Sequence, residues 1–157
     1  MSIFSAGVHS SYEGYRSDVE LSKGGYSMNN AANSAGFYND ILADKLAERH
    51  PTITHLHAAP GNIATRWGTE MPVVIRWAVR FLQLFARSRE DCGEFMYRGL
   101  TRQDYTKNEA GGGFHLVNQY GSEIEGGKTT LHEEAKDFVF EHLMKILDAG
   151  RSAVSTD

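Results

Sequence analysis

The chain contains few of the features that mark exported or membrane-spanning proteins. Its 157 residues include a single cysteine, Cys92, which excludes an internal disulfide framework and a cysteine-rich zinc module. No apolar run reaches the roughly 18 residues that a membrane span requires. The first ten residues also lack the basic flank and long apolar stretch of a signal peptide. We therefore expect a cytoplasmic protein without a transmembrane segment.

An excess of cationic charge is also absent. The chain has 16 lysines and arginines against 20 aspartates and glutamates, which gives a formal net charge of -4. Nucleic-acid-binding domains carry the opposite excess, so a nucleic-acid partner is disfavoured. A hydrophobic content of 41% and a charged content of 23% are ordinary for a globular chain. The length fits one domain.

Three short apolar segments have the composition of β-strands: residues 2–8, 53–58 and 114–118. The second segment ends at a corner formed by Pro60 and Gly61 and continues into Ile63. Parallel sheets in α/β proteins bind ligands beyond the carboxyl ends of their strands. The loop after residues 53–58 is therefore the first candidate binding site.

Helical periodicity lies between and after these segments, and it predicts helices over residues 28–49, 73–86, 89–98 and from Thr130 to about Gly150. Ser88 is placed to cap the third helix. Strands that are separated by helices are typical of a parallel sheet. The long polar connection 9–25 is interpreted as a substrate-side loop.

Two of these helices have a defined apolar face. The face in the first helix is formed by Phe37, Ile41, Leu42 and Leu46, and Asn39, Asp40, Asp44 and Glu48 are expected on the opposite face. The buried stripe of the last helix is expected to contain Ala135, Phe138, Val139, Leu143, Ile146 and Leu147.

The ends of the last helix also carry local signals. Thr130 and Glu133 have the spacing of a capping box, and Gly150 stands where a helix-terminating glycine is common. We therefore expect one domain over residues 1–150, followed by a disordered tail at residues 151–157.

Residues 73–89 admit three interpretations. Apolar side chains, Trp77 and Phe81 among them, share a face, and the charged residues are all arginines. Such a helix could lie on an anionic membrane, cover a hydrophobic ligand, or pack on the core with a solvated basic face.

At this point the chain resembles a known family, the short-chain dehydrogenases/reductases, and specifically their carboxyl-terminal half. The resemblance covers about residues 1–148 and is nearest to fungal-type members. It rests on Ser5-Ala6-Gly7 after a strand, Tyr26-Ser27 followed by Asn30-Ala31-Ala32 at a helix start, His57-Ala58-Ala59-Pro60-Gly61 with Ile63 and Thr65, and a final strand followed by a terminal helix.

The resemblance implies a partial Rossmann-like, doubly wound parallel sheet that lacks the N-terminal nucleotide-binding half. The glycine-rich phosphate loop of the family belongs to that half. The glycines at residues 111–113 precede a strand instead of following one, so they cannot replace the loop. The first strand is expected to have one open edge. The implied cofactor is NAD or NADP.

The resemblance also assigns site residues. Ser5 matches the serine that binds the substrate carbonyl, and Tyr26 is the best match to the tyrosine that exchanges the proton. The lysine expected four residues later is Asn30, which carries no charge to stabilise a phenolate. Backbone and hydroxyl groups at Pro60, Gly61, Ile63 and Thr65 match positions that meet the nicotinamide.

Two functions remain open. The first is an NAD(P)-dependent oxidoreductase that acts on a carbonyl or alcohol, present as an incomplete or degenerate chain. The second is a non-catalytic protein that pairs with a full-length relative. Family dimers pack through the helix that contains residues 37–46, so that helix is the expected oligomer contact. His55 and His57 are expected to be core or strand-end residues instead of metal ligands, and Cys92 is expected to be structural.

Overall fold

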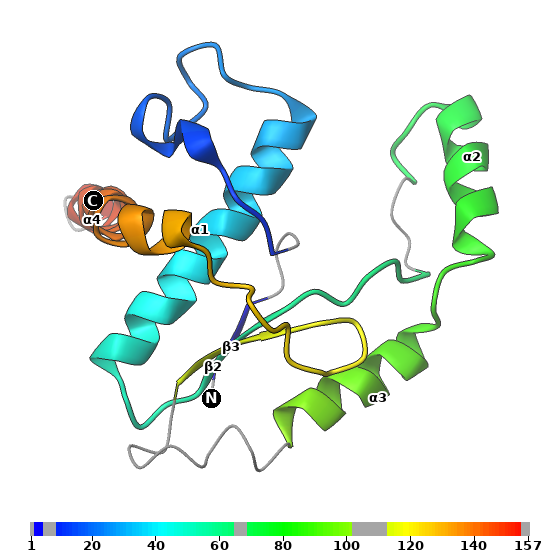
Figure 1. Cartoon of the computed structure of the whole chain (residues 1–157). Helices are drawn as coiled ribbons and strands as arrows, with labels where there is room; N and C mark the ends of the chain where they lie inside the picture. Colours follow the sequence, from blue (N-terminus) through cyan, green and yellow to red (C-terminus); the bar gives the residue numbers. More distant parts are fainter. Residues whose placement is uncertain (1, 5–8, 65–68, 102–112, 155–157) are drawn as a thin grey trace.

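The computed structural model describes residues 2–4, 9–64, 69–101 and 113–154, which form a mixed α/β structure (Figure 1). In chain order its elements are β1 (Ser2–Phe4), the 3-10 helix η1 (Glu13–Arg16), α1 (Met28–Arg49), β2 (His55–Ala58), α2 (Val73–Gln83), α3 (Arg89–Leu100), β3 (Phe114–Val117) and α4 (Thr130–Val154).

The three strands form a parallel sheet in the order β1-β2-β3, as the alternation of strands and helices predicts. Helices α1 and α4 lie on one side of the sheet, and α3 lies on the other side (Figure 1). β2 is the central strand, and β1 pairs with β2 alone among the described residues. The expected open edge of the first strand is therefore present in the described part of the chain.

Side chains of β2 alternate between two different layers. Leu56 and Ala58 pack with Val117, and Met96 and Leu100 of α3 cover them. His55 and His57 point to the opposite face, where His57 meets Asp40 of α1. Both histidines are buried, which confirms that they are core residues.

Several element boundaries are confirmed. α1 has the predicted bounds and is capped by Ser27, whose Oγ accepts a hydrogen bond from the backbone N–H of Asn30 at 3.0 Å. α3 is capped by Ser88, whose Oγ accepts from the backbone N–H of Asp91 at 3.0 Å. α2 ends at Gln83 and gives way to turns before Arg87, so it is shorter than predicted.

α4 begins at the predicted residue, Thr130, but differs from the prediction in its N-terminal cap and at its C-terminal end. The helix continues through Gly150 to Val154, because one glycine costs only about 1 kcal/mol in a helix and nothing lies near this position. Residues 151–154 are therefore helical instead of part of a disordered tail, and residues 155–157 lie outside the described residues. The capping box is absent, since the Glu133 carboxylate pairs with Lys136 at 2.9 Å.

The buried stripe of α4 is rotated relative to the predicted stripe. Its buried positions are His132, Ala135, Lys136, Val139 and Phe140, which follow helical spacing. Phe138, Ile146 and Leu147 are exposed, so the prediction was wrong for them and correct for Ala135 and Val139. The rotation arises because two polar residues of this stripe, His132 and Lys136, bind buried carboxylates of α1.

The connection 9–25, interpreted from the sequence as a substrate-side loop, contributes side chains to the core. Tyr12 and Tyr15 are buried with Phe37 and Ile41 of α1 and Val139 of α4. This packing also buries the α1 face that was expected to form an oligomer contact. Phe37 and Ile41 are at most 1% exposed within this chain, so they are not open to a partner.

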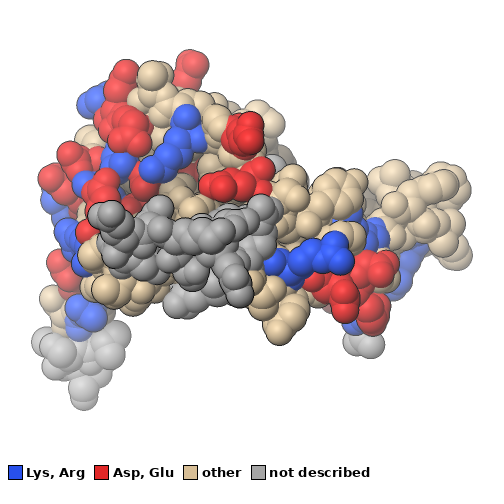
Figure 2. All heavy atoms as spheres, turned by 60° about the horizontal axis from the view of Figure 1, so that its bottom comes forward, with Lys and Arg blue, Asp and Glu red and all other residues tan. Residues whose placement is uncertain are grey.

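α2 projects from the rest of the structure, on the side away from α4 (Figure 1). Val79 is its only buried residue, and Val74 and Trp77 are largely exposed. Figure 2 shows charges of both signs over the body, whereas the projecting end is largely uncharged. The core-packed interpretation of this helix is therefore wrong. Across the described residues, no helix combines the length and apolar character needed to cross a bilayer.

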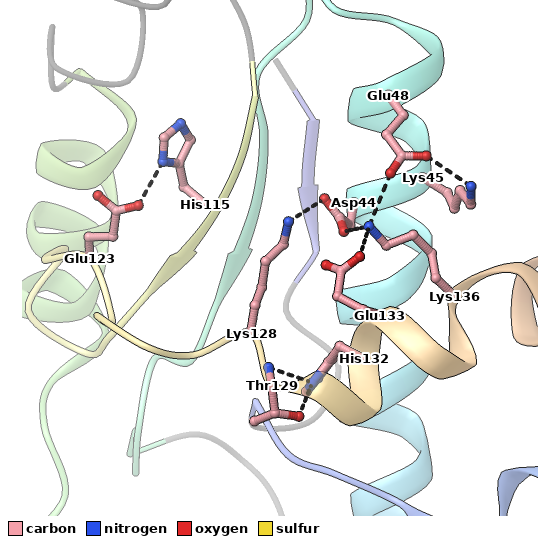
Figure 3. A network of polar contacts seen from close by, with 10 residues as sticks. All are labelled: Asp44, Lys45, Glu48, His115, Glu123, Lys128, Thr129, His132, Glu133 and Lys136. Atoms are coloured by element: carbon pink, nitrogen blue, oxygen red, sulfur yellow. Dashed lines mark hydrogen bonds and ion pairs between the residues drawn. The ribbon is translucent and has the colours of Figure 1, made fainter.

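A polar seam centred on the buried residues Asp44 and Lys136 joins α1 to α4 (Figure 3). The Lys136 ammonium lies 2.6 Å from Asp44, 3.0 Å from Glu48 and 2.9 Å from Glu133. Lys128 pairs with the second oxygen of Asp44 at 2.7 Å. The expectation that Asp40 and Asp44 lie on an outer face of α1 was therefore wrong. Both are buried, because partners on other elements satisfy their carboxylates.

We expect Lys136→Met to lower the free energy of unfolding by about 1–3 kcal/mol near pH 7, because Asp44 and Glu48 lose a cation. Burial lowers the pKa of Lys136, but its hydrogen bonds to Asp44, Glu133 and Glu48 hold that pKa above its usual value. The pKa of Glu48 lies below its ordinary value, chiefly through the hydrogen bond from Lys45 and further through Lys136, against the effect of burial.

These two pKa shifts predict the pH range in which the unfolding free energies of variant and wild type differ most. The Lys136 contribution is present below the lysine's unfolded pKa, and the Glu48 contribution is present above the glutamate's unfolded pKa. The destabilisation should therefore be largest at neutral pH and shrink as Glu48 protonates in acid. Urea unfolding followed by circular dichroism measures it, with Lys145→Met, an exposed site on the same helix, as the control. An equal loss of unfolding free energy in the two variants at pH 7 would contradict a stabilising role of the seam.

Candidate functional site

The loop after β2 turns at Pro60 and Gly61. Gly61 has a φ of +75°, a conformation that favours glycine, and an added Cβ would lie 2.4 Å from the Gln119 amide oxygen. The chain then runs beside Arg87. The Arg87 N–H donates to the carbonyl of Asn62 at 3.0 Å, and the Ala64 N–H donates to the carbonyl of Arg87 at 2.9 Å. The loop is therefore held in one path at the carboxyl end of the central strand.

The loop after β3 lies next to it at the same edge of the sheet. Asn118 organises this turn, because its Oδ1 accepts hydrogen bonds from the N–H groups of Tyr120 at 2.8 Å and Ser122 at 3.1 Å. Gly121 has a φ of +71°, and an added Cβ would lie 2.3 Å from the backbone carbonyl oxygen of Phe95. The turn thus packs directly on the α3 backbone.

Arg87 connects these two loops. Its guanidinium donates a hydrogen bond to the backbone carbonyl of Gln119. The same group stacks over the rings of Phe95, at 4.6 Å, and Tyr120, at 4.8 Å. In the sequence Arg87 is one of several arginines within residues 73–89. Its role in joining the two loops depends on contacts that no local sequence pattern reveals.

A groove of about 520 Å³ lies between the first loop and α2. The loop side is formed by Gly61, Asn62 and Ile63, and the opposite side by Val79, Leu82, Gln83, Phe85 and Ala86. Asn62 and Gln83 are the only lining residues with polar side chains, so the groove is mostly apolar. Its size is in the range of small-molecule sites. A second hollow of about 320 Å³, lined by Ala59, Gly61, Asn118, Gln119 and Tyr120, adjoins it at Gly61.

A separate apolar cavity of about 280 Å³ lies between the sheet and α3. Cys92 is buried at its wall, together with Pro60 and Ile63 from the loop. The expected structural role of Cys92 agrees with this burial. The cavity also shows that the loop contributes side chains to the core as well as to the groove.

The site residues implied by the family resemblance are only partly assembled. Gly61 and Ile63 line the groove, and Pro60 lies beside it. Ser5 and Thr65 lie outside the described residues.

Tyr26 immediately precedes the α1 cap, is 68% exposed and does not line the groove. The side chain of Asn30 donates to the carbonyl of Gly25 at 2.8 Å, so its amide serves the helix start.

A second polar cluster surrounds Asp40, whose side chain is 1% exposed. Its Oδ1 lies 2.5 Å from His57 Nδ1. Its Oδ2 lies 2.7 Å from His9 Nδ1 and 3.3 Å from His132 Nε2. Burial would raise the pKa of Asp40, but hydrogen bonds from His132, His57 and His9 hold it well below its usual value. Asp40 is therefore a buried carboxylate anion that three imidazoles surround.

The sequence contains one local sign of this cluster. Asp40 lies three residues after Phe37 and directly before Ile41, which places a carboxylate within the apolar stripe of α1. Its partners lie 31, 17 and 92 positions away in the chain. Only the folded chain brings them together.

Neither a protein-family model, nor a curated protein, nor a solved structure matches this chain.

We expect Gly121→Ala to destabilise the site strongly, because its Cβ would collide with the α3 backbone. Gly126 is a matched control, since its φ is +69° and nothing lies within 4 Å of an added Cβ. Gly126→Ala should lower the free energy of unfolding by about 1–2 kcal/mol, because alanine is strained in the left-handed conformation. Gly121→Ala should cost about 1–3 kcal/mol more through overpacking. Equal unfolding free energies of the two variants would contradict the close approach.

Proposed function

We propose that this chain forms the nicotinamide-side and substrate-side half of an NAD(P)-dependent oxidoreductase of the short-chain type, acting on an apolar carbonyl or alcohol. One observation carries the proposal. The Pro60-Gly61 turn lies at the carboxyl end of the central strand of a parallel sheet and borders an apolar groove. Ligands of open parallel sheets bind at this edge.

The arrangement of the sheet supports the proposal. β1, β2 and β3 are parallel and adjacent in chain order, and helices lie on both sides of them. This is the arrangement expected for a Rossmann-like half. The fixed paths of the two loops, joined by Arg87, supply a rigid edge for a planar ring.

The residues at this edge fit one end of the implied cofactor. The hollow between Gly61 and Gln119 offers backbone and amide groups to a carboxamide, and it depends on the missing Cβ of Gly61. A reduced nicotinamide, when bound, supplies a hydride. No glycine-rich strand-to-helix turn that could hold the phosphates exists in the described residues. Affinity from this edge alone is therefore expected to be low.

The proposed reaction direction is reduction. In this direction Tyr26 Oη donates its proton to the substrate oxygen as the carbonyl carbon accepts the hydride, and solvent returns the proton to Tyr26. The opposite direction requires a phenolate, and Asn30 provides no charge to stabilise one. Because Tyr26 is exposed and outside the groove, the segment before α1 would have to approach the substrate.

A second function is favoured by a different observation. The Asn30 amide is already bound to the Gly25 carbonyl, and Tyr26 is directed to solvent. These contacts describe a stable helix start without a catalytic arrangement. They favour a non-catalytic binding protein with the same fold.

Titration with NADPH and NADH distinguishes the two functions. For the oxidoreductase half we expect saturable quenching of Trp fluorescence and a change in nicotinamide emission, with weak affinity because the phosphates are not held. The Gly61→Val variant should abolish the change, since its side chain would fill the hollow beside Gln119. The absence of saturable binding by the wild-type chain would exclude the oxidoreductase and leave the non-catalytic function.

The apolar groove is tested with a fluorescent aromatic ketone such as prodan. Leu82 lines the groove and Val74 does not, although both are exposed apolar residues of α2. Leu82→Arg should weaken ketone binding at least about tenfold, because a guanidinium would face apolar walls. Val74→Arg should leave the affinity unchanged. Equal loss in both variants would show that the ketone binds the exposed helix instead of the groove.

A further inference from the structure

We propose that His9, Asp40 and His132 form a binding site for a divalent transition-metal ion, with Zn²⁺ as the best fit. The three side chains come from distant parts of the chain: the segment before η1, the middle of α1 and the first turn of α4. None of them belongs to the groove or to the loops around it. This site is therefore independent of the proposed oxidoreductase function.

The donor atoms already converge. One ligand atom from each residue lies within 4.8 Å of the others. Asp40 Oδ2 is 2.7 Å from His9 Nδ1 and 3.3 Å from His132 Nε2. Tetrahedral zinc with bonds of about 2.0–2.1 Å separates its donor atoms by roughly 3.3 Å. The His132 pair has this spacing, and the His9 pair must open by about half an ångström.

The charge of the cluster favours a cation. In the described part of the chain the ionisable partners of Asp40 are imidazoles. The nearby ammonium groups of Lys128 and Lys136 bind Asp44, one turn further along α1. A buried carboxylate is costly without a compensating positive charge. A divalent ion between His9 and His132 would supply that charge.

Contacts around the donors resemble the outer shell of a metal centre. His57 Nδ1 bonds the other Asp40 oxygen and holds the carboxylate in orientation. The Thr129 hydroxyl lies 2.9 Å from His132 Nδ1 (Figure 3). In this structure the Thr129 N–H donates to the same Nδ1 at 3.3 Å, so Nε2 carries the proton. On metal binding that proton would move from Nε2 to Nδ1, which would then donate to the Thr129 hydroxyl and give up the longer hydrogen bond from the Thr129 N–H.

The donor set and its burial indicate which ion would bind. Two imidazoles and one carboxylate suit Zn²⁺, Co²⁺ or Fe²⁺, whereas Mg²⁺ and Ca²⁺ prefer oxygen donors alone. The side chain of Asp40 is 1% exposed and that of His132 4%, but that of His9 is 20% exposed. An ion would therefore enter past His9, and a water molecule on that side would complete four-coordination.

Titration of the chelator-treated full chain with Co²⁺ tests the site, since tetrahedral cobalt has a characteristic visible absorption. We expect one equivalent of Co²⁺ to bind, and Zn²⁺ to displace it because zinc binds such ligands more tightly. Zn²⁺ should also raise the Tm of the wild-type chain. No saturable binding of either ion by the wild-type chain would overturn the proposal.

Variants locate the ion. His9→Ala should weaken binding by more than the roughly 10- to 100-fold typical of outer-shell changes, and it should abolish the Tm increase. Asp40→Asn should also weaken binding and abolish the Tm increase. If this variant does not fold, the His9→Ala variant still tests the site, because His9 is partly exposed and its loss should not prevent folding. His142→Ala is the control, because His142 pairs with Glu20 at 3.1 Å and does not belong to the ligand cluster. Unchanged affinity in His9→Ala, or an equal loss in His142→Ala, would overturn the assignment.

Discussion

The structure depends on the burial of one carboxylate. Asp40 lies in the middle of α1 and bonds side chains from β2, from the first turn of α4 and from the segment before η1. These bonds are directional, so they define how α1 sits on the sheet and how α4 crosses α1. Apolar contacts around Phe37 and Val139 add energy to the same interface but tolerate more variation in geometry.

The positions of elements follow largely from local signals. Ser88 caps α3 as the sequence predicts, α1 begins at the predicted residue, and the parallel order of the strands follows from the helices between them. Errors occur where long-range contacts override a local pattern. The Asp40 and Asp44 side chains are polar and were therefore expected on the outer face, although each lies three residues after an apolar residue of the α1 stripe. Histidines and lysines distant in the chain pair with them and keep them buried. Gly150 carries a stop signal too weak to end a helix of this length.

The candidate site likewise combines residues that the sequence predicts with residues that only the structure identifies. The Pro60-Gly61 turn is visible in the sequence because turn residues follow an apolar strand, and the structure places it beside the groove. Arg87 holds the adjacent loops through a backbone carbonyl and two aromatic rings, which leave no pattern in the chain. The expectations at Tyr26 and Asn30 come from family resemblance alone, and local hydrogen bonding at the helix start decides where Asn30 lies.

The alternation of β2 has a consequence for folding fidelity. Leu56 and Ala58 face the apolar layer under α3, whereas His55 and His57 face the polar layer on α1. A pairing error of one residue would place imidazoles against Met96 and Leu100 and set leucine opposite the Asp40 carboxylate. Both layers would then lose their partners at once. A four-residue strand, too short to define its register by length, thus has its register defined by the chemical difference between its two faces.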